Sequence, residues 1–573
     1  MRSLGLPGSL GALALAVASF SAPRASPLAS PRPLAEVGYA RDTVYSVEDG
    51  ALDALQDQFR PTLEANRKEL LGQTGEVKGF GAGTIYPQIW LRDSATLIPA
   101  TRYYYGREYL TSWIEEHLSH QRANGELYDW IAAGDAAPFL ANAPRAGRIY
   151  RAGSILLSAD KNTTATDQEA SAVLAAAEVF ALTGDRSWLS KKIVGRPLVE
   201  RLDAALEYVL SHRFSSAYGL VTGAFTADWG DVSPVYPDQR VIYLDERTPV
   251  VVGLYANTLF ARAAEELGAM LARLGDATRG DHWSGQASRI RTNIRRFLWA
   301  ETAGFYRMHR LLPGPGKDVA YDDADTFALG GNALAALYGP ADPLQAGRIF
   351  AAAEDRRRRY GVSTVAGVLL PPYPRGFFKH PIQSDEFTYQ NGGQWDWWAG
   401  RFLLAGFVRG NAGPASRQLR EIARRVQEAG GLYEWYTREG KGRGSARYAG
   451  SAGALAGAVF AGLFGLDSRA DGLAITVRLG AEPGAVRAYE PALDRYVVYR
   501  YSFDGRTRVA RLRYESNAPG FGRLALLLPA GAAALELLLD GRAVPFTGEA
   551  VGRDRYAVLR TDWQPHRLEL RVR

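Results

Sequence analysis

The chain of 573 residues is long enough for two or three domains, and its 47% hydrophobic and 23% charged residues exclude a disordered tail and a membrane bundle. It has no cysteine and seven histidines, none in an HxH or HExxH pair, so we expect no disulfide, no cysteine nucleophile and no metal centre. The net charge of +7 comes largely from scattered arginines, so we expect no nucleic-acid partner.

The N-terminal segment has the pattern of a secretory signal peptide over residues 1–25. Arg2 precedes an apolar run over residues 6–20, and small residues follow it. The run is shorter than the ~18 residues that span a bilayer. A linker rich in proline, serine and alanine is expected over 26–43. These features predict a secreted or periplasmic protein whose mature chain has no stable membrane insertion.

Residues 44–466 repeat one pattern, in which an amphipathic helix ends at glycine and a polar, aromatic loop leads to the next helix. The expected helices are 51–71, 94–105, 107–121, 166–183, 197–212, 249–274, 283–299, 325–338, 343–354, 394–408, 414–429 and 451–464. Thr166 with Glu169 predicts a capping box for the fourth, and Thr248 with Pro249 predicts the start of the sixth. Without credible parallel strands between them, these helices predict a mainly α domain, a toroid of helical hairpins.

The pattern of apolar and polar residues changes after residue 466. Short alternating runs over 475–479, 496–503, 509–514, 524–528, 535–539 and 568–572 predict β-strands. Asp504-Gly505 and Asp540-Gly541 predict hairpin turns between some of them. Residues 467–573 are therefore expected to form a small β-sandwich, for which we favour a structural role because it concentrates neither acids nor tryptophans.

Five parts of the helical domain combine carboxylates with tryptophans. They are 86–94, 128–130, 166–169, 226–232, and the pair 389–398 with 431–436. Arg92 beside Asp93 suits a pair of sugar hydroxyls, because a guanidinium donates in a fixed fork and a carboxylate accepts in pairs. A helix cap is the less favoured alternative for Asp93, whereas Asp167 is open between a cap and a ligand. Glu169 is better explained as a capping-box residue.

The strongest candidates for acid–base chemistry are Asp228 and Asp231, which flank Trp229, and Glu434, which lies between aromatic residues. A carboxyl that packs against indole has a raised pKa, as a general acid requires. Paired carboxylates without histidine, cysteine or metal are typical of glycoside hydrolysis. Neither a GxSxG serine elbow nor a GxxxxGK phosphate loop is present.

At these residues the chain resembles the six-hairpin glycosidases, whose (α/α)6 barrels include trehalases, processing α-glucosidases, glucoamylases and debranching glucosidases. The resemblance is carried by IWLRDS at 89–94, DWGD at 228–231, YQNGGQWDW at 389–397 and LYEWY at 432–436. It implies a general acid at Asp231, with Asp228 second, and a base at Glu434. The trehalase glycine-rich run is absent, so trehalose is not favoured. Asp396 stands where debranching-type relatives have proline, which is a departure from that group.

The sequence thus predicts an exo-acting, inverting hydrolase of terminal α-linked sugars, without a cofactor or metal. An α-glucoside is favoured, followed by an α-mannoside or α-rhamnoside. The residues expected to hold the carbohydrate are Trp90, Arg92, Asp93, Asp129, Trp130, Asp167, Trp229, Asn391, Gln394, Trp395, Asp396 and Trp435. Two alternatives stay open: a glycoside phosphorylase on the same barrel, and a non-catalytic glycan-binding protein.

Overall fold

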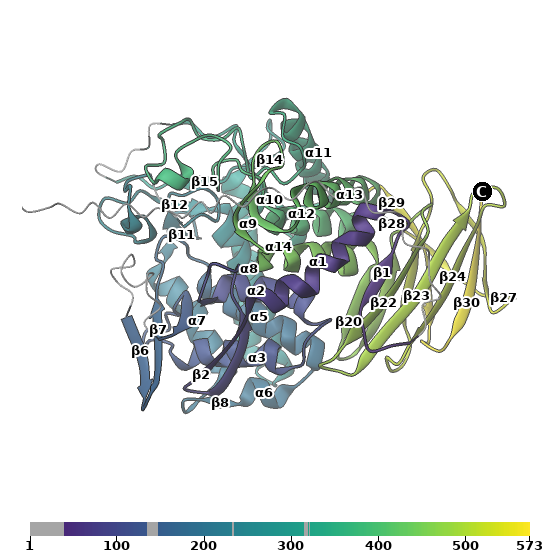
Figure 1. Ribbon diagram of the computed structural model, residues 1–573, viewed down its shortest axis with the longest axis horizontal. Helices are drawn as coiled ribbons and strands as arrows, with labels where there is room; N and C mark the ends of the chain where they lie inside the picture. Colours follow the sequence, from purple (N-terminus) through teal and green to yellow (C-terminus); the bar gives the residue numbers. More distant parts are fainter. Residues whose placement is uncertain (1–38, 135–146, 232–233, 315–318, 320) are drawn as a thin grey trace, which may run out of the picture.

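The computed structural model describes residues 39–134, 147–231, 234–314, 319 and 321–573. The expected signal peptide over 1–25 and most of the expected linker over 26–43 lie outside the described residues. Figure 1 shows a large part built mainly of helices and, beside it, a C-terminal part built of β-sheets. Within the described ranges, no helix is long and apolar enough to cross a membrane.

Each of the twelve expected helices is present, several with shifted ends. They are α1 (Gly50–Asn66), α2 (Leu91–Thr101), α3 (Glu108–Ser119), α5 (Gln168–Thr183), α7 (Leu198–His212), α8 (Leu254–Arg273), α9 (Ala277–Leu298), α10 (Leu329–Tyr338), α11 (Pro343–Arg359), α12 (Asp396–Val408), α13 (Ala412–Ala429) and α14 (Ala449–Gly457). A short helix α6 (Arg186–Ser190) is added, and a π-helical turn over Ala458–Leu463 continues α14.

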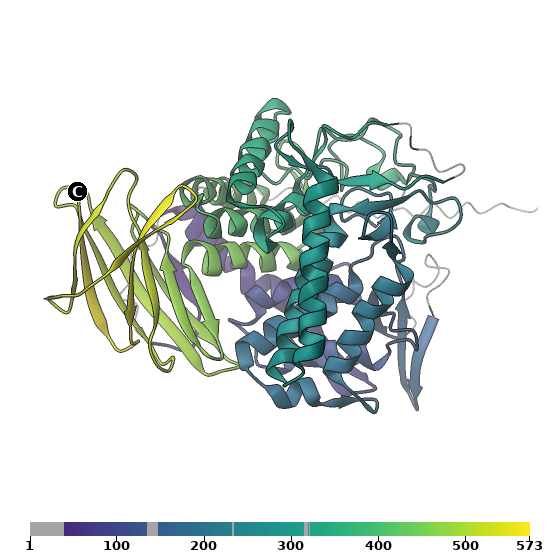
Figure 2. The same cartoon turned by 180° about the vertical axis from the view of Figure 1, so that it is seen from behind.

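Six helices contact one another in a closed cycle: α2 with α5, α5 with α8, α8 with α10, α10 with α12, α12 with α14, and α14 with α2. Small residues allow this close approach, because a Cβ at Gly453 of α14 would lie 2.5 Å from the Thr96 carbonyl oxygen of α2. Six further helices, α1, α3, α7, α9, α11 and α13, pack around the cycle. Of these, α9 covers α8 at the back of the molecule (Figure 2).

Two predicted helix starts are wrong. Thr248-Pro249 does not open a helix, because the β-branched run that follows pairs as strand β12 (Val250–Gly253), and α8 begins only at Leu254. The capping box at Thr166 does not form, since the Thr166 hydroxyl donates to the Thr222 carbonyl. Helix α5 instead begins after Asp167.

Short antiparallel strands lie between the helices along the chain. One sheet has the order β4 (Ile89–Trp90), β5 (Trp130–Ala133), β7 (Ile155–Asp160), β6 (Gly147–Ala152); another has β10 (Phe214–Ser215), β11 (Leu220–Ala224), β12, β15 (His309–Leu311). Two-stranded pairs are β2 (Arg67–Gly72) with β3 (Gly75–Phe80), β8 (Lys192–Ile193) with β9 (Arg196–Pro197), β13 (Trp299–Ala300) with β14 (Phe305–Tyr306), β16 (Phe327–Ala328) with β17 (Leu369–Leu370), and β18 (Tyr433–Tyr436) with β19 (Gly442–Ala446).

The C-terminal part consists of two sheets. The first has the order β1 (Val44–Ser46), β22 (Gly484–Glu490), β23 (Arg495–Asp504), β24 (Val509–Ser516), β30 (His566–Val572), β26 (Ala534–Leu539), β27 (Arg542–Ala543); the second has β20 (Leu466–Arg469), β21 (Gly472–Val477), β25 (Gly522–Leu527), β29 (Asp554–Thr561), β28 (Thr547–Val551). Asp540 and Gly541 turn β26 into β27 with positive φ at both residues, as a two-residue hairpin requires.

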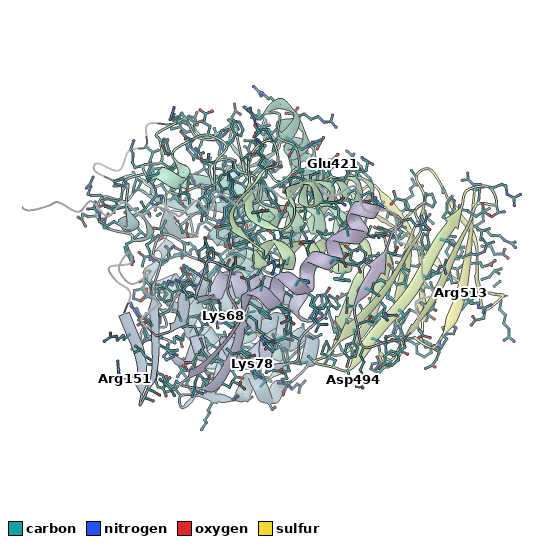
Figure 3. The ribbon with its side chains drawn as sticks, in the orientation of Figure 1. Lys68, Lys78, Arg151, Glu421, Asp494 and Arg513 are labelled. Carbon is teal, nitrogen blue, oxygen red and sulfur yellow. The ribbon has the colours of Figure 1, made fainter. Side chains whose placement is uncertain are left out.

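Strand β1 lies next to β22 although it precedes the first helix of the chain. The N-terminal end of the described chain therefore joins the C-terminal sheet, which fastens the two parts together (Figure 1). Charged side chains are spread over both parts, for example Lys78 and Arg151 on the helical part and Asp494 and Arg513 on the sheets (Figure 3).

Candidate active site

Arg92 is the centre of the site. It lies in the first turn of α2, directly after strand β4, and is 7% exposed. Its Nη1 donates to Asp167 Oδ2 and to the Trp229 carbonyl oxygen, each at 3.1 Å, and its Nη2 lies 3.8 Å from Asp231 Oδ2. One guanidinium therefore joins the N-terminal end of α5 to the loop that carries the predicted general acid.

Asp231 is the more accessible of the two candidate acids, with 24% of its side chain exposed. Besides Arg92, it contacts Gln390, whose Nε2 donates to Asp231 Oδ1 at 3.3 Å. Gln390 comes from the loop before α12, and its own Oε1 is buried without a partner in the described part of the chain. Asp231 thus faces the site with a cation on one oxygen and an amide on the other.

Asp228 points elsewhere. Its backbone is left-handed, with φ of 57°, and its Oδ2 accepts a 2.9 Å hydrogen bond from Gly331 N–H in the first turn of α10. Burial raises the pKa of Asp228 to about 7, while Gly331 and the nearby His309 lower it. The side chain therefore fixes the loop to α10, three residues before Asp231, and this placement favours Asp231 as the general acid.

Glu434 lies on the hairpin of β18 and β19, where the pairing register shifts between Tyr433 and Trp435. Such irregularities in a strand pair redirect a side chain. Glu434 Oε1 accepts from the Tyr86 hydroxyl at 2.9 Å, and Oε2 accepts from Ser445 N–H at 3.0 Å. Burial raises the pKa of Glu434 to about 7, although both hydrogen bonds lower it.

The two predicted catalytic carboxylates belong to one electrostatic cluster. The negative charges of Asp93 and Asp231 both raise the pKa of Glu434. Asp93 lies next to Arg92 on α2, and its Oδ1 accepts a 3.0 Å hydrogen bond from the Tyr448 hydroxyl. Asp93 is therefore a member of the site and does not cap α2, whose N-cap is Trp90.

Trp90 and Trp130 form a wall beside Arg92. They are directly paired residues of β4 and β5, and their ring centroids are 6.1 Å apart. Trp90 is partly exposed, and its buried Nε1–H has no partner within the described residues. Asp129 precedes β5 and is 2% exposed. Burial, together with the negative charge of Asp167 and against the positive charge of Arg92, raises its pKa to about 8. A neutral Asp129 carboxyl can donate as well as accept.

Three of the tryptophans predicted to contact the sugar, Trp229, Trp395 and Trp435, pack into the main hydrophobic core. Trp229 and Trp395 are 1% and 2% exposed, and their ring centroids are 5.5 Å apart in an edge-to-face contact. Trp229 also packs on Trp397 and Trp398 of α12. Trp435 is 9% exposed. Trp229 and Trp395 therefore support the site from behind and do not provide an open stacking surface, whereas Trp435 is as accessible as Arg92 and stays a predicted sugar contact.

Three further predictions of sugar contacts are corrected by the hydrogen bonds. Asn391 exchanges hydrogen bonds with the Tyr373 backbone, N–H to Oδ1 at 2.8 Å and Nδ2 to the carbonyl at 3.0 Å. Gln394 is fully buried, and its Oε1 accepts from Thr364 N–H at 3.0 Å. Asp396 is fully buried in an ion pair with Arg425. These side chains hold the loops that carry the site.

Glu169 also has another role than expected. Its Oε1 accepts from Lys161 Nζ at 2.8 Å and from Leu127 N–H at 2.9 Å, in place of the capping box. Lys161 additionally contacts Gln168 at 3.0 Å, and Gln168 Nε2 lies 3.5 Å from Asp129. This buried network lies directly behind Asp129 and holds it in place.

Several polar residues of the site were not among the predicted contacts: Tyr86, Tyr255, Tyr389, Gln390 and Tyr448. Tyr86 and Tyr389 are the first residues of two acid-bearing segments, and this position is the sequence feature from which they could have been predicted. Tyr255, which donates to Asp167 Oδ2 at 2.7 Å, lies within α8, where nothing in the helix pattern distinguishes it. Within the described ranges, no group of three or more His, Cys, Asp or Glu side chains is arranged to hold a metal ion.

Residues 86–451 match the family described as the mannosylglycerate hydrolase MGH1-like glycoside hydrolase domain. No curated protein sequence matches the chain. Among solved structures, a mannosylglycerate hydrolase of family GH63 from Thermus thermophilus, in complex with Tris, is 16% identical, with a TM-score of 0.53 over 70% of this chain and 99% of its own.

Two rhamnosidases are also similar. The GH78 enzyme of Bacillus sp. GL1 is 15% identical, with a TM-score of 0.54 over 86% of this chain. The α-L-rhamnosidase of Streptomyces avermitilis, complexed with L-rhamnose, is 14% identical, with a TM-score of 0.55 over 92%. This chain spans 43% and 42% of their lengths, and at these identities the likeness shows the fold alone. The family match, which spans more than half of the chain, confirms the resemblance to six-hairpin glycosidases: the chain belongs to the mannosylglycerate hydrolase MGH1-like glycoside hydrolases.

Proposed function

We propose that this glycoside hydrolase removes terminal α-linked sugars and inverts the anomeric configuration, with Asp231 as general acid and Glu434 as general base. The proposal is carried by the position of these two carboxylates in one cluster, on loops from different parts of the chain, around Arg92 and Asp93. Inverting glycosidases use such a pair, separated by enough space for a water molecule.

The reaction follows from what each carboxyl contacts. Asp231, which is partly open to solvent, gives its proton to the glycosidic oxygen as the bond from that oxygen to the anomeric carbon breaks. Glu434, oriented by Tyr86 and Ser445, takes a proton from a water molecule, whose oxygen bonds to the anomeric carbon from the opposite side. One proton enters the leaving group and one leaves the water. Proton exchange with solvent then returns Asp231 to its protonated form and Glu434 to its ionised form.

The terminal sugar is held by the polar groups beside these carboxylates. Arg92 and Asp93 contact its hydroxyls, and Trp90 with Trp130 closes one side of the subsite. Asp129 and Asp167 lie behind Arg92 and help to hold the sugar from there. Asp167 already accepts a hydrogen bond from the Arg92 guanidinium.

The closed cycle of six helices, with six helices outside it, supports the arrangement as an (α/α)6 toroid over 44–466. The two C-terminal sheets support a β-sandwich over 467–573. The expected signal peptide, with its basic start and apolar run, supports export to the periplasm or the medium.

The family name and two of the structural relatives refer to mannosylglycerate and to rhamnosides. We therefore place α-mannosides and α-rhamnosides beside α-glucosides as the first substrates to test. The test is a panel of aryl and natural α-glycosides of these three sugars, with NMR of the freshly released sugar. Inverted configuration supports the proposal, and retained configuration contradicts it.

Variants separate the roles. Asp231→Asn is expected to lose most activity on alkyl glycosides and to keep much of it on aryl glycosides with good leaving groups, which need little protonation. Glu434→Gln is expected to lose activity on both. If Asp228→Asn shows the selective pattern in place of Asp231→Asn, the acid is misassigned. Turnover that requires inorganic phosphate would indicate a phosphorylase, and sugar binding without any turnover would indicate a glycan-binding protein.

A further inference from the structure

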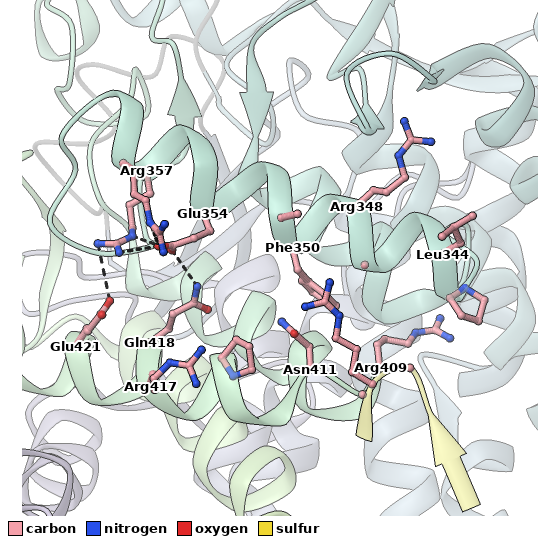
Figure 4. Close-up of a pocket in the computed structure, with 18 residues that line it drawn as sticks. Leu344, Arg348, Phe350, Glu354, Arg357, Arg409, Asn411, Arg417, Gln418 and Glu421 are labelled. Atoms are coloured by element: carbon pink, nitrogen blue, oxygen red, sulfur yellow. Dashed lines mark hydrogen bonds and ion pairs between the residues drawn. The ribbon is translucent and has the colours of Figure 1, made fainter. Parts of the chain in front are cut away.

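A second cavity lies outside the active site. It measures about 590 Å³ and lies between α11 and the first half of α13, and the turn between β28 and β29 closes one end (Figure 4). None of the residues assigned to the active site lines it. The cavity therefore lies where the helical part meets the C-terminal sheets, and its lining residues take no part in the proposed reaction.

Arginines dominate its lining. They are Arg348, Arg357, Arg358, Arg409, Arg417 and Arg553, against the two acids Glu354 and Glu421. Arg357 Nη2 lies 2.9 Å from Glu354, and its Nη1 lies 3.9 Å from Glu421, so one arginine links both acids. Arg348 is paired with Glu301 outside the cavity, and Figure 4 shows it pointing away from α13.

Arg358 is also paired with Glu354, with its Nε 2.6 Å from Oε1. The remaining three arginines, Arg409, Arg417 and Arg553, have no carboxylate partner within 4 Å among the described residues. Arg409 donates through Nε to the Ala336 carbonyl oxygen at 2.7 Å, which fixes its stem. Partial burial lowers the pKa of Arg409, as expected for a guanidinium that lacks a counter-charge. Three guanidiniums that line one cavity without a partner carboxylate leave an unbalanced positive potential that favours an anion.

The backbone holds two of these arginines in fixed positions. Gly410 and Gly552, both with positive φ, are in contact, since a Cβ at Gly410 would lie 1.7 Å from the Val551 carbonyl oxygen and one at Gly552 would lie 2.4 Å from that of Arg409. Arg553 N–H donates to the Gly410 carbonyl at 2.9 Å. Arg409 and Arg553 flank this contact, so two parts of the fold bring them together.

The lining also has an apolar component. Phe350 lies in its floor, and Pro343, Leu344 and Pro414 border it; Leu344 is 74% exposed. Guanidiniums bind carboxylate and sulfate with paired hydrogen bonds, and the C–H faces of a sugar ring pack on apolar side chains. An acidic saccharide carries both kinds of surface on one unit.

We propose that this cavity binds an anionic saccharide, a sugar chain that carries carboxylate or sulfate groups, at a site separate from the catalytic one. The carbohydrate class of the ligand rests on the proposed function, whereas the anionic character rests on Arg409, Arg417 and Arg553 alone. Bound there, a polymer would be held on the enzyme while its free end is cleaved elsewhere.

The test is calorimetric titration of the full chain carrying Asp231→Asn, so that no ligand is consumed. The probes are a sulfated heparin hexasaccharide, a hexagalacturonate, neutral maltohexaose and inorganic sulfate. We expect at least one acidic hexasaccharide to bind, more weakly at high salt, and maltohexaose not to compete. The two acidic probes distinguish sulfate from carboxylate recognition.

A matched pair of double variants locates the binding. Arg417→Gln with Arg553→Gln is expected to weaken it about tenfold or more, since each removes charge-assisted hydrogen bonds. Arg424→Gln with Arg506→Gln removes two exposed arginines outside the cavity and is expected to change it less than about twofold.

Equal weakening by both pairs, or no weakening by the first, would overturn the site. Inorganic sulfate that binds as tightly as the hexasaccharides would overturn its saccharide character. The outcome is separable from the proposed function: if the wild type cleaves no glycoside yet the titration succeeds, the hydrolase proposal fails and the anion site stands.

Discussion

The Tyr86 hydroxyl donates a 2.9 Å hydrogen bond to Glu434 Oε1, and so joins the loop before β4 to the hairpin of β18 and β19, although the two residues are 348 positions apart in the sequence. The bond stabilises the charged carboxylate and lowers its pKa, whereas burial raises that pKa to about 7. Tyr86, together with Ser445, therefore counteracts the effect of burial on the pKa of the proposed base.

Tyr86→Phe removes this bond and leaves the ring. We expect the pKa of Glu434 to rise, so that the acidic limb of the kcat/KM profile moves to higher pH by about one unit. The direction follows because a general base acts only when ionised. The measurement is a pH–rate profile from about pH 5 to 9, with Tyr360→Phe as a control outside the cluster. An unmoved acidic limb would show that Glu434 is not the base.

A second prediction concerns stability at Asp228. Its folded-state pKa of about 7 lies above the ordinary aspartate value, so the folded state binds more protons than the unfolded state between about pH 4 and 7. The contribution of this carboxyl to stability is complete at low pH and is lost as pH rises through 7. Asp228→Asn has no proton to lose, so its stability relative to wild type is expected to increase with pH.

The difference is measured by denaturant unfolding of both proteins at about pH 5, 7 and 9, and should grow by a few kcal/mol over this range. Asp231→Asn, on the same loop, is the comparison for local effects. A constant difference between Asp228→Asn and wild type would mean that Asp228 is ionised in the folded protein, contrary to its burial against α10.

Gly444 provides a test of the geometry at the base. Its φ is +69°, and a Cβ built there would lie 2.5 Å from Glu434 Oε2. Gly444→Ala is therefore expected to displace the carboxylate and lower kcat by about 100-fold. Gly361→Ala is the matched control, because its φ is +64° and nothing lies within 4 Å of the added Cβ.

Both substitutions strain the backbone by a similar amount, so a comparable loss of activity in the two variants would point to strain and not to displacement of Glu434. Steady-state kinetics and melting temperatures of both variants give the comparison. A Gly444→Ala enzyme with wild-type kcat would show that the position of this carboxylate is not critical.

The helices were predictable because each has its own pattern of apolar residues and a glycine or polar stop, as at Gly184 after α5. The cycle they form depends on contacts between helices far apart in sequence, such as Gly453 against Thr96, which no local pattern contains. For the same reason the pairing of β1 with β22 was not predictable.

The site was predictable in composition and less so in roles. Local sequence identified Arg92, Asp231 and Glu434 because acids and aromatics concentrate around them. It did not distinguish Asp396 from a sugar ligand, because the partner of that carboxyl, Arg425, lies 29 residues later on α13. Some carboxyls face the sugar and others are neutralised inside the protein. Such distant partners decide between these two roles.

That distinction leads to the last prediction. If Asp396 acts only through its buried ion pair with Arg425, Asp396→Ala leaves an unpaired guanidinium and is expected to lower the free energy of unfolding by about 3–5 kcal/mol. Replacing both residues, with Asp396→Leu and Arg425→Met, should recover much of this loss. At a temperature where the double variant is folded, its KM should match that of wild type, since no sugar contact is removed. A double variant that is stable but has a KM raised more than about tenfold would restore Asp396 as a substrate ligand, because loss of a hydrogen bond to a charged group has that effect.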